Sequence, residues 1–198
     1  MSPDTSQNPV TAHRDAGAAR IAPATPPFGE AIQRRLERVM PPGVEPLVLF
    51  TTLARDERLF ERFMRASLLD PGHLSLHQRE VVIDRVTARC GSEYEWGVHV
   101  ALFAPAAGLG ADQLRSTRSG GAGDLCWSAE DALLISLCDA LHDDCAIEDG
   151  LWDELSARFD EETMIELLLL CGFYRTVSYL TNALRLPLEP GTARFADH

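Results

Sequence analysis

The sequence contains no lysine, so all 18 basic residues among its 198 are arginine. Schiff-base catalysis and the phosphate-binding P-loop both depend on a lysine, and both are therefore excluded. Acidic residues number 30, which gives a formal net charge of -12. A nucleic-acid groove needs a basic surface that displaces counterions, so nucleic acid is not an expected partner. An anionic ligand would have to be held by arginine, by backbone N–H groups or by a helix N-terminus.

Membrane and export signals are also missing from the sequence. No apolar run approaches the roughly 18 residues that span a membrane. The N-terminus lacks the basic region and apolar stretch of a signal peptide. We therefore expect a cytoplasmic protein with no membrane partner. A hydrophobic content of 45% over 198 residues predicts one domain with a substantial core.

The cysteines form no C-x-x-C pair. Their odd number and irregular spacing argue against a disulfide framework or a zinc site. The five are Cys90, Cys126, Cys138, Cys145 and Cys171. Cys138 and Cys171 lie in apolar helical runs and are most simply small core residues. Cys90 precedes a predicted helix, where the helix dipole can activate a thiol, although a buried inert thiol is the simpler interpretation.

No segment shows the alternation of apolar and polar residues that is typical of a strand, so the predicted fold class is all-α. Residues 1–28 are rich in Pro, Ala, Thr and Gly and predict a disordered or extended arm. The domain is expected over residues 29–190, and residues 191–198 form a tail. Helical spacing and capping residues predict helices over 30–40, 45–54, 57–69, 76–89, 93–107, 128–144, 149–159 and 161–186. Residues 110–124 read as a polar, Gly-rich loop. The helix over 161–186 is apolar nearly all round, which places it in the core or under another subunit.

The stretch from Arg79 to His99, REVVIDRVTARCGSEYEWGVH, reads as a helix, a break at Cys90-Gly91 and a second helix. Glu95 and His99 are four residues apart and share a helix face. The break can fold Glu80 back toward them. Acids and a histidine on a mostly buried helix pair need one another as partners, because burial penalises an unpaired charge.

Three explanations of this cluster remain open at the level of sequence. It can be a functional site, or a structural hydrogen-bond network in which Ser92 caps the helix and Glu95 completes a capping box. Glu80, Glu95 and His99 can also ligate a metal, although no fourth ligand is visible and no metal is expected.

The same stretch, closed by the residues AAGL, resembles the carboxymuconolactone decarboxylase family, which includes the alkylhydroperoxidase D-like proteins. Residues 141–189 resemble, more diffusely, the C-terminal part of one branch, and the resemblance covers roughly residues 28–189. In the peroxidase-like members a glutamate precedes a C-x-x-C-x-x-x-H motif by twelve residues. By position, Glu80 and His99 fall on the glutamate and histidine that relay protons. Ser92 and Glu95 stand where the two cysteines would be. A dithiol cycle needs two sulfurs in reach of each other, so peroxidase activity of that kind is disfavoured.

The resemblance implies a compact helical domain of the alkylhydroperoxidase D-like type. It also implies a homo-oligomer, a trimer or hexamer, with sites close to the subunit interfaces. The decarboxylase branch lacks the dithiol, keeps a histidine in this helix and acts on small carboxylated lactones.

The leading hypothesis is therefore a cofactor-independent enzyme that transfers protons on a small organic acid or lactone. His99 is the expected general acid or base, with Glu95 as its partner or a second base and Glu80 orienting them. Residues expected to contact the substrate are Tyr94, Ser92, Cys90, Trp96, Arg89 and His142, with Arg85 as a second candidate to hold a carboxylate. The alternatives are a thiol peroxidase, or a small-ligand-binding oligomer that has kept the scaffold and lost the chemistry.

Overall fold

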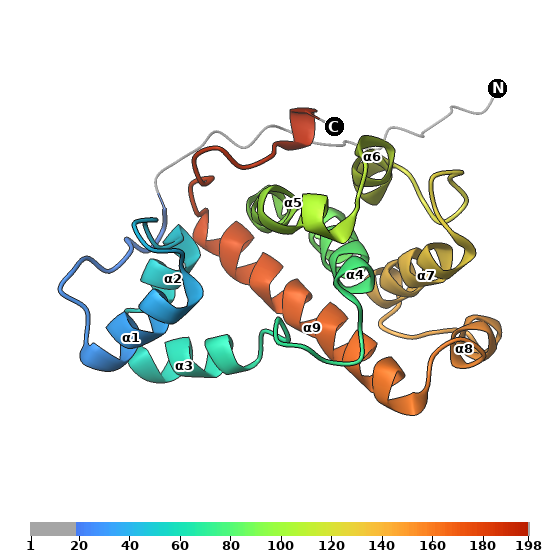
Figure 1. Cartoon of the computed structure of the whole chain (residues 1–198), viewed down its shortest axis with the longest axis horizontal. Helices are drawn as coiled ribbons and strands as arrows, with labels where there is room; N and C mark the ends of the chain where they lie inside the picture. Colours follow the sequence, from blue (N-terminus) through green and yellow to red (C-terminus); the bar gives the residue numbers. More distant parts are fainter. Residues whose placement is uncertain (1–18, 198) are drawn as a thin grey trace, which may run out of the picture.

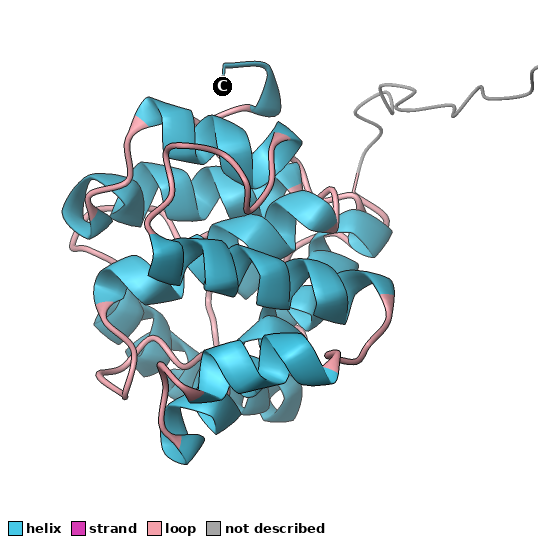
Figure 2. Ribbon diagram, turned by 90° about the vertical axis from the view of Figure 1, so that its right-hand side faces the viewer, coloured by secondary structure: helices cyan, strands magenta, loops and turns pink. Residues whose placement is uncertain are grey.

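The computed structural model describes residues 19–197, which form nine α-helices and one 3-10 helix and contain no strand. The helices are α1 (Glu30–Val39), α2 (Val48–Leu53), α3 (Glu57–Arg65), α4 (Leu76–Arg89), α5 (Glu93–Ala107), α6 (Ala111–Ser119), α7 (Ala129–Asp143), α8 (Asp149–Ser156), α9 (Glu161–Leu184) and η1 (Phe195–Asp197). Figure 1 shows α1 to α3 at one end of the long axis and α7 and α8 at the other, with α9 running between them. Figure 2 shows only helices and loops. The predicted all-α fold is confirmed.

Helix α4 lies at the centre of the bundle and packs against α5, α6, α7 and α9 (Figure 1). It begins with a capping box, in which Ser75 Oγ accepts from the Gln78 N–H and Gln78 Oε1 accepts from the Ser75 N–H. Every side chain from Glu80 to Thr87 is buried. A helix with neighbours on all sides is apolar nearly all round, so the few polar residues of this run are carried into the interior.

Helix α5 turns back along α4 after the break at Gly91. Gly91 has φ +63°, a conformation that glycine adopts without strain. Ser92 is the predicted N-cap, and its Oγ accepts from the Glu95 N–H at 3.4 Å. The Glu95 carboxylate does not complete the capping box that the sequence allowed, since it faces the ring of His99 instead. The helix ends, as predicted, with Gly108 in the left-handed conformation.

The loop predicted over residues 110–124 is wrong in its first half, which forms α6. Gln113 Oε1 accepts from the Gly110 N–H and so satisfies the start of this helix. Leu114 and the hydroxyl-bearing Ser116 and Thr117 are its buried residues. A helix held by one leucine and two hydroxyl groups lacks an apolar stripe, which explains why its composition resembles that of a loop.

Other helix boundaries also differ from the prediction, and α8 ends at Ser156 instead of at residue 159. Helix α3 ends at Arg65 instead of at residue 69, and the chain then forms a loop in which Leu68 has a positive φ. Helix α2 begins at Val48 instead of at residue 45. The cause at α2 is Pro46, because a proline disfavours helical backbone at the residue before it.

Helix α9 has one buried face and one exposed apolar face. Leu167, Leu170 and Val177 are fully buried, whereas Ile165 and Leu169 are each 59% exposed. The prediction that α9 is apolar nearly all round is therefore correct as a pattern, although this chain alone covers only one side of it. A stripe of exposed large apolar side chains is a feature that interaction surfaces share.

Helix α9 is also long and apolar enough to cross a membrane, with a mean hydropathy of 1.2, and 44% of the window that passes this test is buried. The expectation that no apolar segment approaches membrane-spanning length is therefore wrong for α9. The central helix of a bundle meets the same criterion of length and composition. The packing of α9 against α4, α5 and α8 places it in that class.

Both ends of the described chain pack on the bundle. The arm predicted over residues 1–28 lies outside the described residues up to residue 18. From residue 19 it runs along the domain, with Arg20 N donating to Leu184 O and Ala24 N to Thr51 O. The predicted tail folds over α5, where the Phe195 ring lies 5.2 Å from the Trp96 ring.

The C-terminal segment crosses α5 at Gly97, and the carbonyl oxygen of Ala193 occupies the space that a Cβ would need. We predict that Gly97→Ala lowers the free energy of unfolding by about 1–3 kcal/mol, because the methyl group displaces this segment. The matched control is Gly172→Ala in α9, where a Cβ meets nothing within 4 Å. This control should stabilise by roughly 0.5–1 kcal/mol. Urea denaturation of both variants measures the difference, and equal stabilities would contradict the prediction.

Candidate active site

The structure brings Glu80, Glu95 and His99 together between α4 and α5. Glu80 Oε2 accepts a hydrogen bond from His99 Nδ1 at 2.7 Å, and Glu95 Oε1 lies 3.5 Å from His99 Nε2. All three side chains are buried, Glu80 completely. The second Glu80 oxygen accepts from Arg79 Nε at 3.2 Å. The hydrogen bond at Nδ1 of His99 is thus short, and the contact at Nε2 is longer.

The two glutamates determine the charge of His99. Burial alone would lower the pKa of His99, but the hydrogen bonds and negative charges of Glu80 and Glu95 outweigh it and raise the pKa to about 10. The ring is therefore an imidazolium at neutral pH, with an N–H directed at each carboxylate. Such a group can donate a proton from Nε2 to a ligand that displaces Glu95.

Aromatic side chains surround the His99 ring. Tyr174 of α9 meets it edge-on at 5.0 Å between ring centroids, and Phe103 lies 5.2 Å away one turn further along α5. The Arg79 guanidinium sits 5.9 Å from the centre of the Phe103 ring. This apolar enclosure keeps water away from the charged groups and strengthens their mutual attraction.

Asp84 is a fourth member of the cluster, and the sequence analysis missed it. Asp84 is one turn after Glu80 on α4 and is fully buried. Neither of its carboxyl oxygens has a hydrogen-bond partner among residues 19–197. Burial raises the pKa of Asp84 well above its usual range; the positive charge of His99 opposes this rise and the charge of Glu80 adds to it. Its four-residue spacing from Glu80 was the signal that could have revealed it.

Three of the predicted contact residues on α5 have their polar groups bonded elsewhere. Tyr94 Oη accepts from the Leu49 N–H at 3.0 Å and donates to Glu189. Ser92 Oγ shares a hydrogen bond of 2.8 Å with Thr181 Oγ1. Trp96 Nε1 donates to Thr117 Oγ1 at 3.1 Å, on the side of α6. These contacts fix α5 against α2, α9 and α6, and none of them involves His99.

Cys90 and His142 form a separate pair at the far end of α4, with 3.8 Å between Cys90 Sγ and His142 Nδ1. Burial raises the pKa of the Cys90 thiol, although Arg175 and Arg89 oppose this rise. Burial and the same two arginines lower the pKa of His142. The helix dipole therefore does not activate this thiol; the pair is a neutral thiol beside a neutral imidazole.

The predicted carboxylate-binding arginines are both engaged in ion pairs. Arg85 binds the Asp139 carboxylate through Nε and Nη2 at 2.7 Å each. Its Nη1 donates to the carbonyl oxygens of Ser116, Thr117 and Gly120. Arg89 Nη2 donates to Asp143 at 2.6 Å, and its Nε lies 3.3 Å from Asp139. Both guanidinium groups fasten α4 to α7, so neither is free to hold a ligand at His99.

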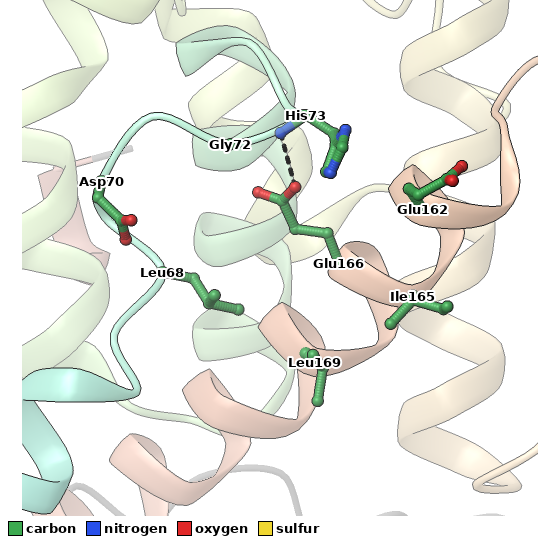
Figure 3. A pocket seen from close by; sticks show the side chains of 8 residues that line it. All are labelled: Leu68, Asp70, Gly72, His73, Glu162, Ile165, Glu166 and Leu169. Atoms are coloured by element: carbon green, nitrogen blue, oxygen red, sulfur yellow. Dashed lines mark hydrogen bonds between the residues drawn. The ribbon is translucent and has the colours of Figure 1, made fainter.

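A surface pocket lies apart from this cluster, between the loop before α4 and the outer face of α9 (Figure 3). Leu68, Ile165 and Leu169 line it together with acidic side chains. Glu166 Oε2 accepts from the His73 N–H at 2.7 Å, as the dashed line in Figure 3 marks. The carboxylate therefore ties this loop to α9. Within residues 19–197, no group of three or more His, Cys, Asp or Glu side chains is arranged to hold a metal ion.

The chain was compared with known protein families and solved structures. The profile of the carboxymuconolactone decarboxylase family matches residues 57–137, from α3 into α7. The crystal structure of an uncharacterized peroxidase-related protein from Silicibacter sp. TM1040 has a TM-score of 0.76. The likeness covers 91% of this chain and 96% of that chain at 14% sequence identity, which shows a shared fold. No curated protein sequence matches the chain.

These findings confirm the resemblance to the carboxymuconolactone decarboxylase family and the alkylhydroperoxidase D-like helical fold. The match contains Glu80, Asp84, Glu95 and His99. It ends before residues 141–189, so it does not bear on the second, more diffuse stretch of resemblance.

We predict that His99 keeps both ring protons well above neutral pH. The imidazole ¹⁵N shifts of one histidine should remain those of an imidazolium up to about pH 9, because its pKa is raised to about 10. His99→Gln should remove this signal. The proton that His99 binds stabilises the fold fully below about pH 6.5, and this contribution is lost as the pH rises through about 10. A His99 ring that titrates near its ordinary value would contradict the prediction.

Proposed function

We propose that the protein is a cofactor-independent enzyme that transfers protons on a small organic acid or lactone. The observation that carries this proposal is the buried His99 imidazolium, held between Glu80 and Glu95. Two acids and a cationic histidine in an apolar enclosure are suited to move protons at carbon. The family domain over residues 57–137 supports the same class of chemistry.

The two contacts of His99 suggest different roles for its ring nitrogens. The short bond to Glu80 fixes the orientation of the ring through Nδ1. The longer contact to Glu95 leaves Nε2–H as the proton that a substrate can reach. When a substrate displaces Glu95, the pKa of His99 falls, because one of the charges that raised it has moved away. Nε2 then protonates the developing carbanion or enolate, and the displaced Glu95 acts as the base.

Decarboxylation and isomerisation fit this arrangement because each passes through an enolate, and lactone opening fits because His99 can protonate the leaving ring oxygen. The proposed enzyme is cytoplasmic. Thiol peroxidase activity is disfavoured, because Ser92 and Glu95 replace the dithiol and burial raises the pKa of the Cys90 thiol.

We predict that His99→Ala and Glu95→Gln each lower turnover at least about 100-fold on any lactone or β-keto acid that the wild type converts, because each removes a proton-transfer group. His73→Ala, on an exposed loop, is the matched control and should leave turnover unchanged. Conversion of no compound in such a panel would count against an enzyme and favour a ligand-binding protein, and full activity of His99→Ala would refute the role of His99 in proton transfer. Rapid hydroperoxide reduction that disappears in Cys90→Ser would instead support the thiol peroxidase.

We further propose that the chain forms a homo-oligomer, a trimer or hexamer, in which another copy covers the outer face of α9. Ile165 and Leu169 are each 59% exposed there, and Tyr179 is 58% exposed. Burying such side chains is worth roughly 1.5–3 kcal/mol each. We predict that Ile165→Glu combined with Leu169→Glu yields monomers in light scattering. Leu125→Glu, a lone exposed residue in a loop, should not change the mass. A monomeric wild type would contradict this proposal.

A further inference from the structure

The register of α4 against α5 predicts that Asp84 and Glu95 lie at the same level of the helix pair. The two helices run in opposite directions from the break at Gly91, and Glu80 on α4 meets His99 on α5. One turn onward from Glu80 is Asp84, and one turn back from His99 is Glu95. Since both helices advance equally per turn, the second pair of residues is opposed in the same register as the first.

Both of these side chains carry oxygens that accept no hydrogen bond from the described part of the chain. Asp84 Oδ1 and Oδ2 are buried without a hydrogen bond, and so is Glu95 Oε2. Asp84 is completely buried and Glu95 is 6% exposed. Buried polar atoms are paired in the great majority of cases, and an isolated pair of them beside a candidate active site points to a ligand.

The charges around Asp84 decide which form it takes. The charged groups that act on it are His99 on α5 and Glu80 on its own helix, and Tyr174 on α9 is a further titratable group that interacts with it. The imidazolium of His99 is already balanced by the carboxylates of Glu80 and Glu95. A third buried carboxylate would have no cationic partner. The protonated form of Asp84 is therefore lower in free energy than the ionised form.

We propose that Asp84 is a neutral carboxylic acid that, together with the Glu95 carboxylate, binds one hydroxyl group beside His99. The Asp84 O–H is a free donor and Glu95 Oε2 a free acceptor. A hydroxyl group, from a substrate or from water, accepts one hydrogen bond and donates another, and so it satisfies both. This inference rests on the proposed function and narrows its substrates to hydroxylated, uncharged compounds such as hydroxylactones or enols.

The arginines around the site favour an uncharged ligand over a carboxylate. Arg85 and Arg89 are bound to the carboxylates of α7. Arg79, which is bonded to Glu80, also donates from Nη1 to the Leu69 carbonyl at 2.9 Å. An incoming carboxylate would add a negative charge to a group of carboxyls and would have to displace Glu80 from Arg79. A hydroxyl group has neither cost.

Infrared spectroscopy tests the protonation of Asp84 directly. The carbonyl stretch of a protonated carboxylic acid lies above the amide bands, and we expect the wild type to show it at neutral pH. Asp84→Asn should abolish this band, and Asp153→Asn, at an exposed position of α8, should leave it in place. A spectrum of the wild type that matches Asp84→Asn would overturn the assignment. Because the readout needs no turnover, it holds whether or not the chain proves to be an enzyme.

Binding of small probes tests the ligand class. α-Hydroxy-γ-butyrolactone should shift the Asp84 band, whereas γ-butyrolactone, which lacks the hydroxyl group, and acetate should not. Asp84→Leu removes the donor and should weaken binding of the hydroxylactone at least about tenfold, as expected for the loss of one buried hydrogen bond. A band that the hydroxylactone leaves unmoved, or one that acetate shifts, would refute the proposal.

The stability of Asp84→Asn tests whether Asp84 is a neutral acid or a carboxylate in the folded protein. A group whose pKa is raised by folding stabilises the protein at low pH and loses that contribution as the pH rises. Asn cannot titrate, so the free energy of unfolding of Asp84→Asn relative to the wild type should increase from about pH 4 upward. A relative stability that falls with pH would show that Asp84 is a stabilising carboxylate and would contradict the proposal.

Discussion

The hydrogen bond between Glu80 and His99 joins the two helices on which the interior of the molecule is built. It is formed between fully enclosed groups, where a carboxylate and an imidazolium attract each other far more strongly than in water. Removing His99 would leave two buried carboxylates, Glu80 and Glu95, with Arg79 as the cation beside Glu80, and an excess of buried charge is strongly destabilising. The pairing therefore fixes the register of α4 against α5, and the register in turn decides which other side chains meet.

Further contacts connect α4 and α5 to the elements that surround them. Arg85 fastens α4 to α6 and α7 through five hydrogen bonds, which use the fork geometry that a lysine could not supply. The Tyr94 hydroxyl fastens α5 to α2 and to the C-terminal segment. The polar residues of the core thus divide into two kinds. Some, such as Arg85 and Tyr94, form hydrogen bonds that connect helices. Others, beside His99, have buried oxygens without a hydrogen bond.

Much of the fold could be predicted from the sequence, because the apolar spacing and the caps at Ser75, Ser92, Ser128 and Asp160 are local signals that the packing respects. Helix α6 could not, since its stability comes from tertiary contacts of Ser116 and Thr117.

The candidate site could also be predicted only in part from the sequence. The convergence of Glu80, Glu95 and His99 follows from spacing and one break in the chain. The partners of Trp96, Cys90 and Arg89 lie on α6 and α7, which no local pattern reveals. The role of Asp84 could not be predicted from the sequence. Its position in a run of valine and isoleucine does not reveal that it lacks a hydrogen-bond partner, because this depends on the helices that pack around it.

The loop before α4 links the two faces of α9. At one point Glu166 holds it through the His73 N–H, and at another the Leu69 carbonyl accepts from Arg79, which binds Glu80. Gly72 allows this closeness, because the Glu166 carboxylate fills the space of a Cβ there. A continuous series of hydrogen bonds therefore runs from Glu166, on the solvent-facing side of α9, through the loop and Arg79 to Glu80 and the buried ring of His99.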